Sequence, residues 1–143
     1  MTKVTLTQIG PGARFEAKNE AGGTLRLEGT PEMGGTGEAL RPMEALLASL
    51  AGCSGIDVVK ILSQQKEPLT GLVIRVDGKR ADAIPAVFTD IHVVYEIHGP
   101  VAENKARRAV ALSAEKYCSV SKMLEPTVKL THEVVLLPEG PAK

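Results

Sequence analysis

The sequence predicts an α+β fold with mostly antiparallel strands, in the order βββ-α-ββ-α-α-β. Alternating polar and apolar residues fill the first third of the chain, and a long apolar segment with helical spacing follows. The later strands and helices do not alternate as regularly as a doubly wound sheet requires. Because 143 residues suit one hydrophobic core, we expect a single domain over residues 1–143.

The first third is expected to form three short strands. Period-two alternation places them at Lys3 to Ile9, Arg14 to Lys18 and Thr24 to Glu28. Turns are expected at Pro11-Gly12 and at Ala21-Gly22-Gly23, which fits antiparallel neighbours.

The glycine-rich segment from Gly29 to Ala39 is expected to be a loop. It contains neither a G-x-G-x-x-G pattern nor a following G-K-[ST], so a phosphate-binding loop is disfavoured. The segment therefore predicts a flexible connection into the next helix.

A long helix is expected from Pro42 to Gln65. No charge lies between Glu44 and Asp57, which predicts burial nearly all round the helix. Gly52 and Gly55 each cost about 1 kcal/mol against alanine in a helix interior, so we expect another element to pack closely there. One sheet hardly covers such a helix, and a second subunit is expected to help.

The remaining elements follow the same two periodicities. They are a strand around Leu72 to Val76, turn residues at Asp77-Gly78 and at Ala83 to Pro85, a strand from Val87 to His98, a helix from Ala102 to Tyr117, a short helix from Val120 to Leu124, and a last strand from Val128 to Val134.

Composition argues against several classes of protein. The 17 basic and 17 acidic residues balance and aromatic residues are scarce, which disfavours a nucleic-acid partner. Met1 to Gly10 is not a signal peptide, and the uncharged stretch from Ala45 to Ile56 is shorter than the ~18 residues of a membrane span. We therefore expect a cytoplasmic protein without a membrane partner.

The two cysteines, Cys53 and Cys118, are far apart in the sequence. Neither belongs to a CxxC or Cys/His pair, so no structural metal site is expected. A reactive thiolate needs a cation or donor nearby. Cys118 has Lys116 and Lys122 close in sequence, whereas Cys53 would need an arginine from the strands. The sequence leaves open whether the two sulfurs meet.

The three histidines fall on predicted strands. His92 and His98 share a face but lie ~20 Å apart along it, so they do not bind one metal ion together. His132 stands among apolar residues, as core or edge histidines do. A cysteine hydrolase would need one of these histidines beside a thiol, and the spacing does not place one there.

Two segments resemble one known family. Arg41 to Cys53, RPMEALLASLAGC, resembles the Pro…Glu-Leu-Leu…Ala-Gly-Cys helix of the OsmC/Ohr proteins, the osmotically inducible and organic hydroperoxide resistance proteins. Lys116 to Leu124, KYCSVSKML, resembles the Cys-Pro-Val-Ser segment of the same family. The order of strands and helices also agrees, so the resemblance extends over essentially the whole chain.

The resemblance implies an intertwined homodimer whose sheets wrap long central helices, and a thiol peroxidase acting on organic hydroperoxides. Cys53 would attack the peroxide and become a sulfenic acid, and Cys118 would resolve it as a disulfide. A dithiol reductant of the lipoyl type would reopen that bridge, and no separate cofactor is implied.

The chain departs from the family pattern around the expected Glu–Arg pair. Met43 stands where the peroxidases have the glutamate, and Glu44 comes one residue later. Arg14 and Arg26 each resemble the arginine position of one branch of the family. Ser119 replaces the usual proline after the second cysteine. Glu44, Arg14 and Arg26 are therefore candidates to support the Cys53 thiolate.

Two other functions stay open at this point. The same dimer pocket would suit a non-enzymatic protein that binds a small apolar ligand or senses redox state. A cysteine hydrolase that uses His92 or His132 is the third hypothesis.

Overall fold

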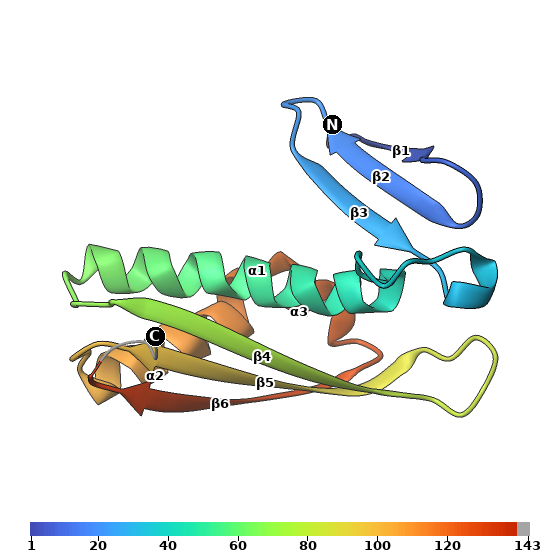
Figure 1. Cartoon of the computed structure of the whole chain (residues 1–143). Coiled ribbons are helices and arrows are strands. Elements are labelled where there is room, and N and C mark those ends of the chain that lie inside the picture. The colour runs from blue at the N-terminus through green and yellow to red at the C-terminus, as the bar shows by residue number, and fades with distance from the viewer. Residues whose placement is uncertain (140–143) are drawn as a thin grey trace. The chain divides into compact units, whose positions relative to one another are not determined.

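The computed structural model describes residues 1–139, and the end of the predicted domain, residues 140–143, lies outside the described part. The backbone forms two compact units, residues 1–46 and 47–143, and each contains one three-stranded sheet. The elements follow the predicted order (Figure 1), and the α+β fold class is confirmed. The single domain over 1–143 stays a prediction.

The first unit holds an antiparallel sheet in the order β1-β2-β3. Its strands are β1 (Val4–Gln8), β2 (Arg14–Asn19) and β3 (Thr24–Glu28). The turn between β2 and β3 lies where it was predicted, with Gly22 at a φ of 91° that favours glycine.

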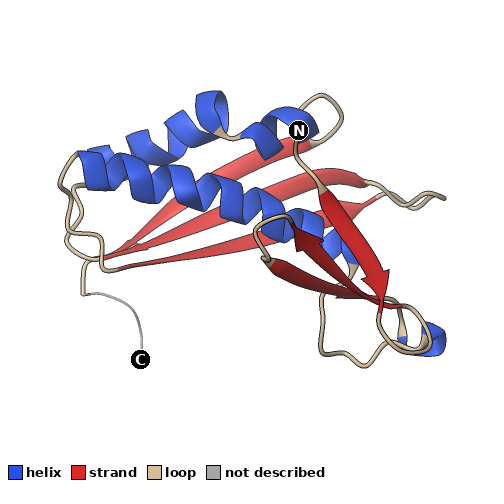
Figure 2. Cartoon of the chain, turned by 90° about the horizontal axis from the view of Figure 1, so that it is seen from above, coloured by secondary structure: helices blue, strands red, loops and turns tan. Residues whose placement is uncertain are grey.

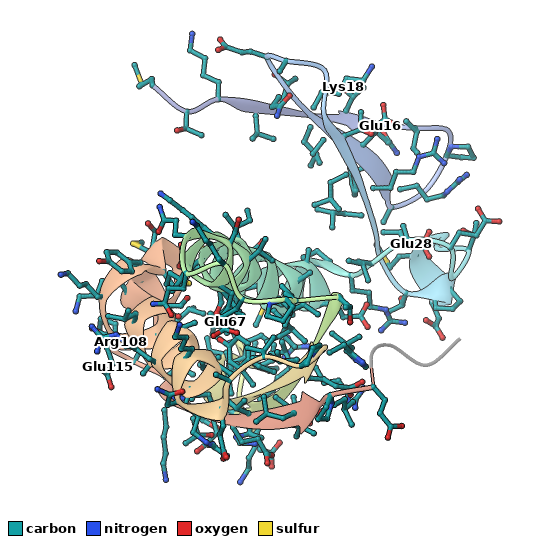
Figure 3. The ribbon with its side chains drawn as sticks, turned by 90° about the vertical axis from the view of Figure 1, so that its left-hand side faces the viewer. Glu16, Lys18, Glu28, Glu67, Arg108 and Glu115 are labelled. Atoms are coloured by element: carbon teal, nitrogen blue, oxygen red, sulfur yellow. The ribbon has the colours of Figure 1, made fainter. Side chains whose placement is uncertain are left out.

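One face of this sheet is apolar and the other is charged, because residues opposite each other in an antiparallel pair share a face. The strand register aligns Leu6, Ala17 and Leu25 in one row, in which both leucines are exposed. On the other face Glu16 lies 3.7 Å from Lys18, both labelled on β2 in Figure 3. The apolar row is thus left available for a partner.

The loop after β3 is organised by Glu28, whose side chain is buried (Figure 3). Thr36 Oγ1 donates to its carboxylate at 3.1 Å, and the Gly37 N–H donates to the other oxygen. The backbone N–H of Glu28 donates to the carbonyl of Leu40, so the segment expected to be a loop returns to the sheet. It contains one short 3-10 turn, η1 (Pro31–Met33).

Helix α1 (Pro42–Gln64) begins where it was predicted and ends one residue earlier. Glu44 accepts a hydrogen bond from the Arg41 N–H at 2.8 Å, which is half of a capping box. By length and composition α1 is the one helix within residues 1–139 that could cross a membrane, a property it shares with core helices of soluble proteins.

The second unit holds the sheet β4-β5-β6, with β4 and β5 antiparallel and β5 and β6 parallel. Both α1 and α2 lie along one face of this sheet, as Figures 1 and 2 show together. The bounds of its elements are β4 (Gly71–Arg80), β5 (Phe88–His98), α2 (Glu103–Leu112), the π-helical segment η2 (Ser113–Tyr117), α3 (Ser119–Leu124) and β6 (Lys129–Leu137).

The core of this unit lies between the helices and the inner face of the sheet. Alternate residues of β5 are buried there, as the period of two requires. The buried side chains of β5, α1 and α2 include Ile91, Val93, Tyr95, Ile97, Leu50, Val58, Leu62, Ala106, Ala109 and Val110.

Two glycines allow close packing in this unit. A Cβ at Gly55 would lie 3.1 Å from Ile74 Cδ1, so the expected close approach to α1 is confirmed there. A Cβ at Gly78 would lie 2.5 Å from the Phe88 ring, and β4 continues through this residue. The predicted turn at Asp77-Gly78 is therefore wrong, because this glycine makes room for an aromatic ring instead of bending the chain.

The prediction that α1 is buried nearly all round is wrong for the single chain. Ile56 is 70% exposed. No described atom lies within 4 Å of a Cβ built at Gly52, so packing of this chain does not explain that glycine. The open side of α1 is consistent with the expectation that a second subunit helps to cover the helix.

Removing the Glu28 carboxylate tests the order of the loop in the first unit. Burial raises the pKa of Glu28, but the hydrogen bonds from Thr36, Gly37 and Ala39 outweigh it and hold the pKa below its usual value. A lowered pKa means that the carboxylate stabilises the fold above the unfolded-state pKa, and that this stabilisation is lost as the pH falls through the folded-state pKa. We expect Glu28→Gln to unfold at lower temperature than wild type at pH 7 and the two melting temperatures to converge as the pH falls through the lowered pKa of Glu28. Equal melting temperatures at pH 7 would contradict this account.

Candidate active site

Cys53 and Cys118 come together in the second unit. Cys53 lies midway along α1 and is half-buried, whereas Cys118 lies between η2 and α3 and is only 3% exposed. The two side chains lie close enough to affect each other's ionisation, and both thiols are free. The question that the sequence left open is therefore answered, since the two cysteines lie close together.

Cys118 is fixed by the short helix that follows it. Its backbone is extended, with φ −75° and ψ 107°, and its Sγ accepts the Ser121 N–H at 3.4 Å, as an N-cap residue does. The predicted break between two helices at this cysteine is confirmed. A thiol thus occupies the capping position where serine or aspartate is common.

The surroundings favour the neutral form of Cys118. Burial raises the pKa of the Cys118 thiol, the hydrogen bonds from Ser121 lower it by less, and the nearby Cys53 raises it further. Cys118 is therefore a protonated thiol at neutral pH.

A buried chain of hydroxyl groups lies beside the cysteine pair. Tyr95 Oη is hydrogen-bonded to Ser54 Oγ, which lies 3.1 Å from Ser113 Oγ, which in turn lies 2.9 Å from Asp57 Oδ2. Ser54 and Ser113 are fully buried and Tyr95 is 2% exposed. Each hydroxyl left unpaired at such a site would cost about 1–3 kcal/mol. Desolvation raises the pKa of Tyr95, and its hydrogen bond to Ser54 lowers it by less.

These hydroxyl residues were not identified as functional from the sequence. Ser54 and Asp57 follow Cys53 by one and four residues, and Asp57 is the first charge after the uncharged stretch, so a local signal was present. Tyr95 and Ser113 lie 41 and 59 residues from Ser54, and no sequence pattern indicates that they meet.

A cavity of about 540 Å³ opens on the Cys53 side of α1. The α1 residues that line it follow Cys53 by 4, 7, 8 and 11 positions, which places them on its helix face. Tyr117, the residue before Cys118, lines the cavity as well. The full lining is Asp57, Lys60, Ile61, Gln64, Gln65, Arg108, Leu112 and Tyr117.

The other three candidates, Arg14, Arg26 and Glu44, lie in the first unit. Arg26 pairs with Glu16 at 3.5 Å across the sheet, and Glu44 caps the first turn of α1. Arg14 pairs in register with Glu28 on β3. Their support of the Cys53 thiolate stays a prediction.

The contacts of His92 and His132 described within residues 1–139 are made with residues other than the two cysteines. His92 bridges Thr131 and Glu133, on the opposite face of β5 from Tyr95, at 2.7 and 2.9 Å. His132 packs edge-on to Tyr95 with ring centroids 6.4 Å apart. Within residues 1–139 no cluster of three His, Cys, Asp or Glu side chains could hold a metal ion.

Comparison with known proteins identifies the family of the chain. The family model of OsmC-like proteins matches residues 35–133, which include both cysteines. Protein YhfA of Escherichia coli strain K12 is 35% identical over 122 residues, which cover 85% of this chain and 88% of YhfA.

Solved structures share the fold. A hypothetical protein from Aquifex aeolicus VF5 superposes with a TM-score of 0.79 at 33% identity and covers 95% of this chain and 97% of its own. An organic hydroperoxide resistance protein OsmC from Legionella pneumophila superposes with a TM-score of 0.67 at 21% identity, covering 94% and 96%. With the two-cysteine site and the matched residues 35–133, these similarities show that the chain belongs to the OsmC family.

Proposed function

We propose that the protein reduces organic hydroperoxides through Cys53 and Cys118. The observation that carries this proposal is the proximity of two free thiols from elements 65 residues apart in the sequence. Family membership supports it, and the Legionella pneumophila relative is described as an organic hydroperoxide resistance protein and predicted redox protein.

Cys53 is the thiol that attacks the peroxide in this proposal. It is half-buried, and the 540 Å³ cavity begins one helical turn away at Asp57. Cys118 is almost fully buried, and its pKa is raised by that burial. Because the thiolate is the nucleophile, the more accessible Cys53 suits the first step and Cys118 the second.

The reaction balances with these two thiols. The Cys53 thiolate attacks the terminal oxygen of ROOH, the O–O bond breaks, and the leaving alkoxide takes a proton to give ROH. The Cys118 thiolate then attacks the sulfur of the Cys53 sulfenic acid, a disulfide forms and water leaves. A dithiol reductant of the lipoyl type returns two electrons and two protons by thiol–disulfide exchange.

The cavity favours an organic hydroperoxide over hydrogen peroxide. Ile61, Leu112 and Tyr117 contribute apolar surface to it, and its volume is far larger than hydrogen peroxide needs. The alkyl group of the substrate would bury this surface, which raises its local concentration at Cys53.

One observation favours the alternative, a non-enzymatic protein that binds an apolar ligand or senses redox state. Glu44, the candidate partner for an active-site arginine, already accepts a hydrogen bond from the backbone N–H of Arg41 at the start of α1. A carboxylate used in this way is less free to orient an arginine at a thiolate.

The protein is further proposed to act as a homodimer, as members of this family typically do. Exposed Ile56 and Val59 lie on the open side of α1, beside Gly52, and Leu6 and Leu25 are exposed on the first sheet. Exposed apolar surfaces of this kind mark interaction sites, and a second copy supplies a matching one.

Thiol counting tests the peroxidase proposal. We expect about one equivalent of cumene hydroperoxide to consume both thiols of the reduced wild type, and hydrogen peroxide to do so more slowly. Cys53→Ser should keep its remaining thiol, whereas Cys118→Ser should lose its thiol to a sulfenic acid without forming an intrachain disulfide. If both thiols survive excess cumene hydroperoxide, the peroxidase proposal is wrong and the non-enzymatic alternative is favoured. Ester turnover with free thiols would instead support the hydrolase.

The pH dependence of disulfide closure tests the role of Cys118. Since its pKa is raised, the thiolate fraction grows about tenfold per pH unit through the neutral range. We expect the closing rate, followed by quenched-flow alkylation, to rise in this proportion from pH 6 to 8 without a plateau. Ser121→Ala removes a hydrogen bond that lowers this pKa and should slow closure, while Ser119→Ala serves as the neighbouring control. A plateau below pH 8 is the contrary result.

A charge placed on the open side of α1 tests the dimer. We expect Ile56→Lys to shift the sedimenting species from dimer to monomer at micromolar protein. Val73→Lys is the matched control, because it adds the same charge to the outer face of β4 opposite Glu96. If Ile56→Lys sediments as wild type does, this side of α1 is not the interface.

A further inference from the structure

Ser113, the first residue of η2, is hydrogen-bonded both to α1 and to Cys118. Its Oγ lies 2.9 Å from Asp57 Oδ2 and 3.1 Å from Ser54 Oγ, both on α1. Its backbone carbonyl accepts the Cys118 N–H at 2.9 Å. Ser54 is the residue directly after Cys53. Two hydrogen bonds through Ser113 therefore join the neighbour of one cysteine to the backbone of the other.

We propose that Ser113, held by Asp57, is a positioning residue that sets how closely Cys118 lies to Cys53 and so controls closure of the disulfide between them. This inference rests on the proposed pairing of the two cysteines.

The segment that carries Cys118 is anchored at its first residue. Of the five residues of η2, Ser113 is the buried one, and Glu115, Lys116 and Tyr117 are exposed. A π-helical turn is rare and is frequent at functional sites. The Ser113 hydroxyl fixes this turn to α1 through its hydrogen bonds to Asp57 and Ser54.

Asp57 lies at one end of the hydroxyl chain and accepts the hydrogen bond that Ser113 donates. An ionised carboxylate only accepts hydrogen bonds, and each hydroxyl carries one proton to donate. Ser113 therefore donates to Asp57, and the Ser54 hydroxyl lies within hydrogen-bond distance of both Ser113 and Tyr95. The bond between Ser113 and Asp57 is charge-assisted and is the strong link of the chain.

A dithiol–disulfide equilibrium measures this positioning without any peroxide. The reduced protein and oxidised dithiothreitol exchange to give the Cys53–Cys118 disulfide and reduced dithiothreitol, so two electrons and two protons pass to the reagent. The equilibrium constant reports the effective concentration of one protein thiol at the other. It should fall when the segment carrying Cys118 loses its anchor.

The experiment compares Ser113→Ala, Asp57→Ala, Asp57→Asn and Ser119→Ala in dithiothreitol redox buffers, with thermal unfolding of each reduced protein. We expect Ser113→Ala and Asp57→Ala to lower the equilibrium constant at least tenfold. Asp57→Asn keeps an acceptor oxygen and should stay within about threefold of wild type. Ser119→Ala, beside Cys118 but outside the hydroxyl chain, should not change it.

A purely structural role predicts a different pattern. If the melting temperature falls while the equilibrium constant stays within twofold of wild type, or rises, the inference is overturned. If Ser113→Ala does not fold, the contrast between Asp57→Ala and Asp57→Asn decides the matter. A wild type that closes its disulfide with dithiothreitol but ignores organic hydroperoxide would refute the proposed function and leave the positioning role standing.

Discussion

The packing of α1 against the inner face of the second sheet is the constraint on which the rest of the site depends. Gly55 lets Ile74 approach the helix closely, and fully buried Val58 and Leu62 continue the same contact. Because this side of α1 is fixed on the sheet, Cys53 is held near the segment that follows α2. The opposite side, with Ile56, remains free for association.

The two cysteines differ because they lie in different backbone conformations. Cys53 belongs to a regular helix, which gives it a fixed direction and a cavity along its own face. Cys118 ends a π-helical turn and caps a short helix, so its sulfur is buried and hydrogen-bonded. One thiol is thus half-exposed and the other is shielded, and this asymmetry is the basis of the different steps that we propose for them.

Most of the fold was predictable because each helix and strand has its own local period of polar and apolar residues. The strand from Thr24 to Glu28 and the start of α1 at Pro42 were predicted to the residue. Gly78 was misread because turn chemistry and space for the Phe88 ring both call for glycine, and only the folded chain distinguishes them. Glu44 lies three residues after Arg41, which is the spacing of a capping box, so its role as a helix cap could have been predicted from the sequence.

The candidate site was predictable only in part. Both cysteines were identified through the resemblance of their segments to one family, but their proximity depends on a helix, two strands and a turn that must pack correctly. The contacts of Ser54 with Tyr95 and of Ser113 with Asp57 join residues 41 and 56 positions apart. Such pairings are set by tertiary packing, which a single sequence does not reveal.

Peptide mapping after stoichiometric oxidation tests the central claim, that Cys53 and Cys118 of one chain act as a pair, most directly. The reduced protein is treated with one equivalent of cumene hydroperoxide, digested without reductant, and its linked peptides are identified by mass spectrometry. Our account predicts one product, in which the peptide containing Cys53 is joined to the peptide containing Cys118, from protein that migrates as a monomer on a non-reducing denaturing gel. Disulfides between chains, or over-oxidised Cys53 beside an unlinked Cys118, would contradict it.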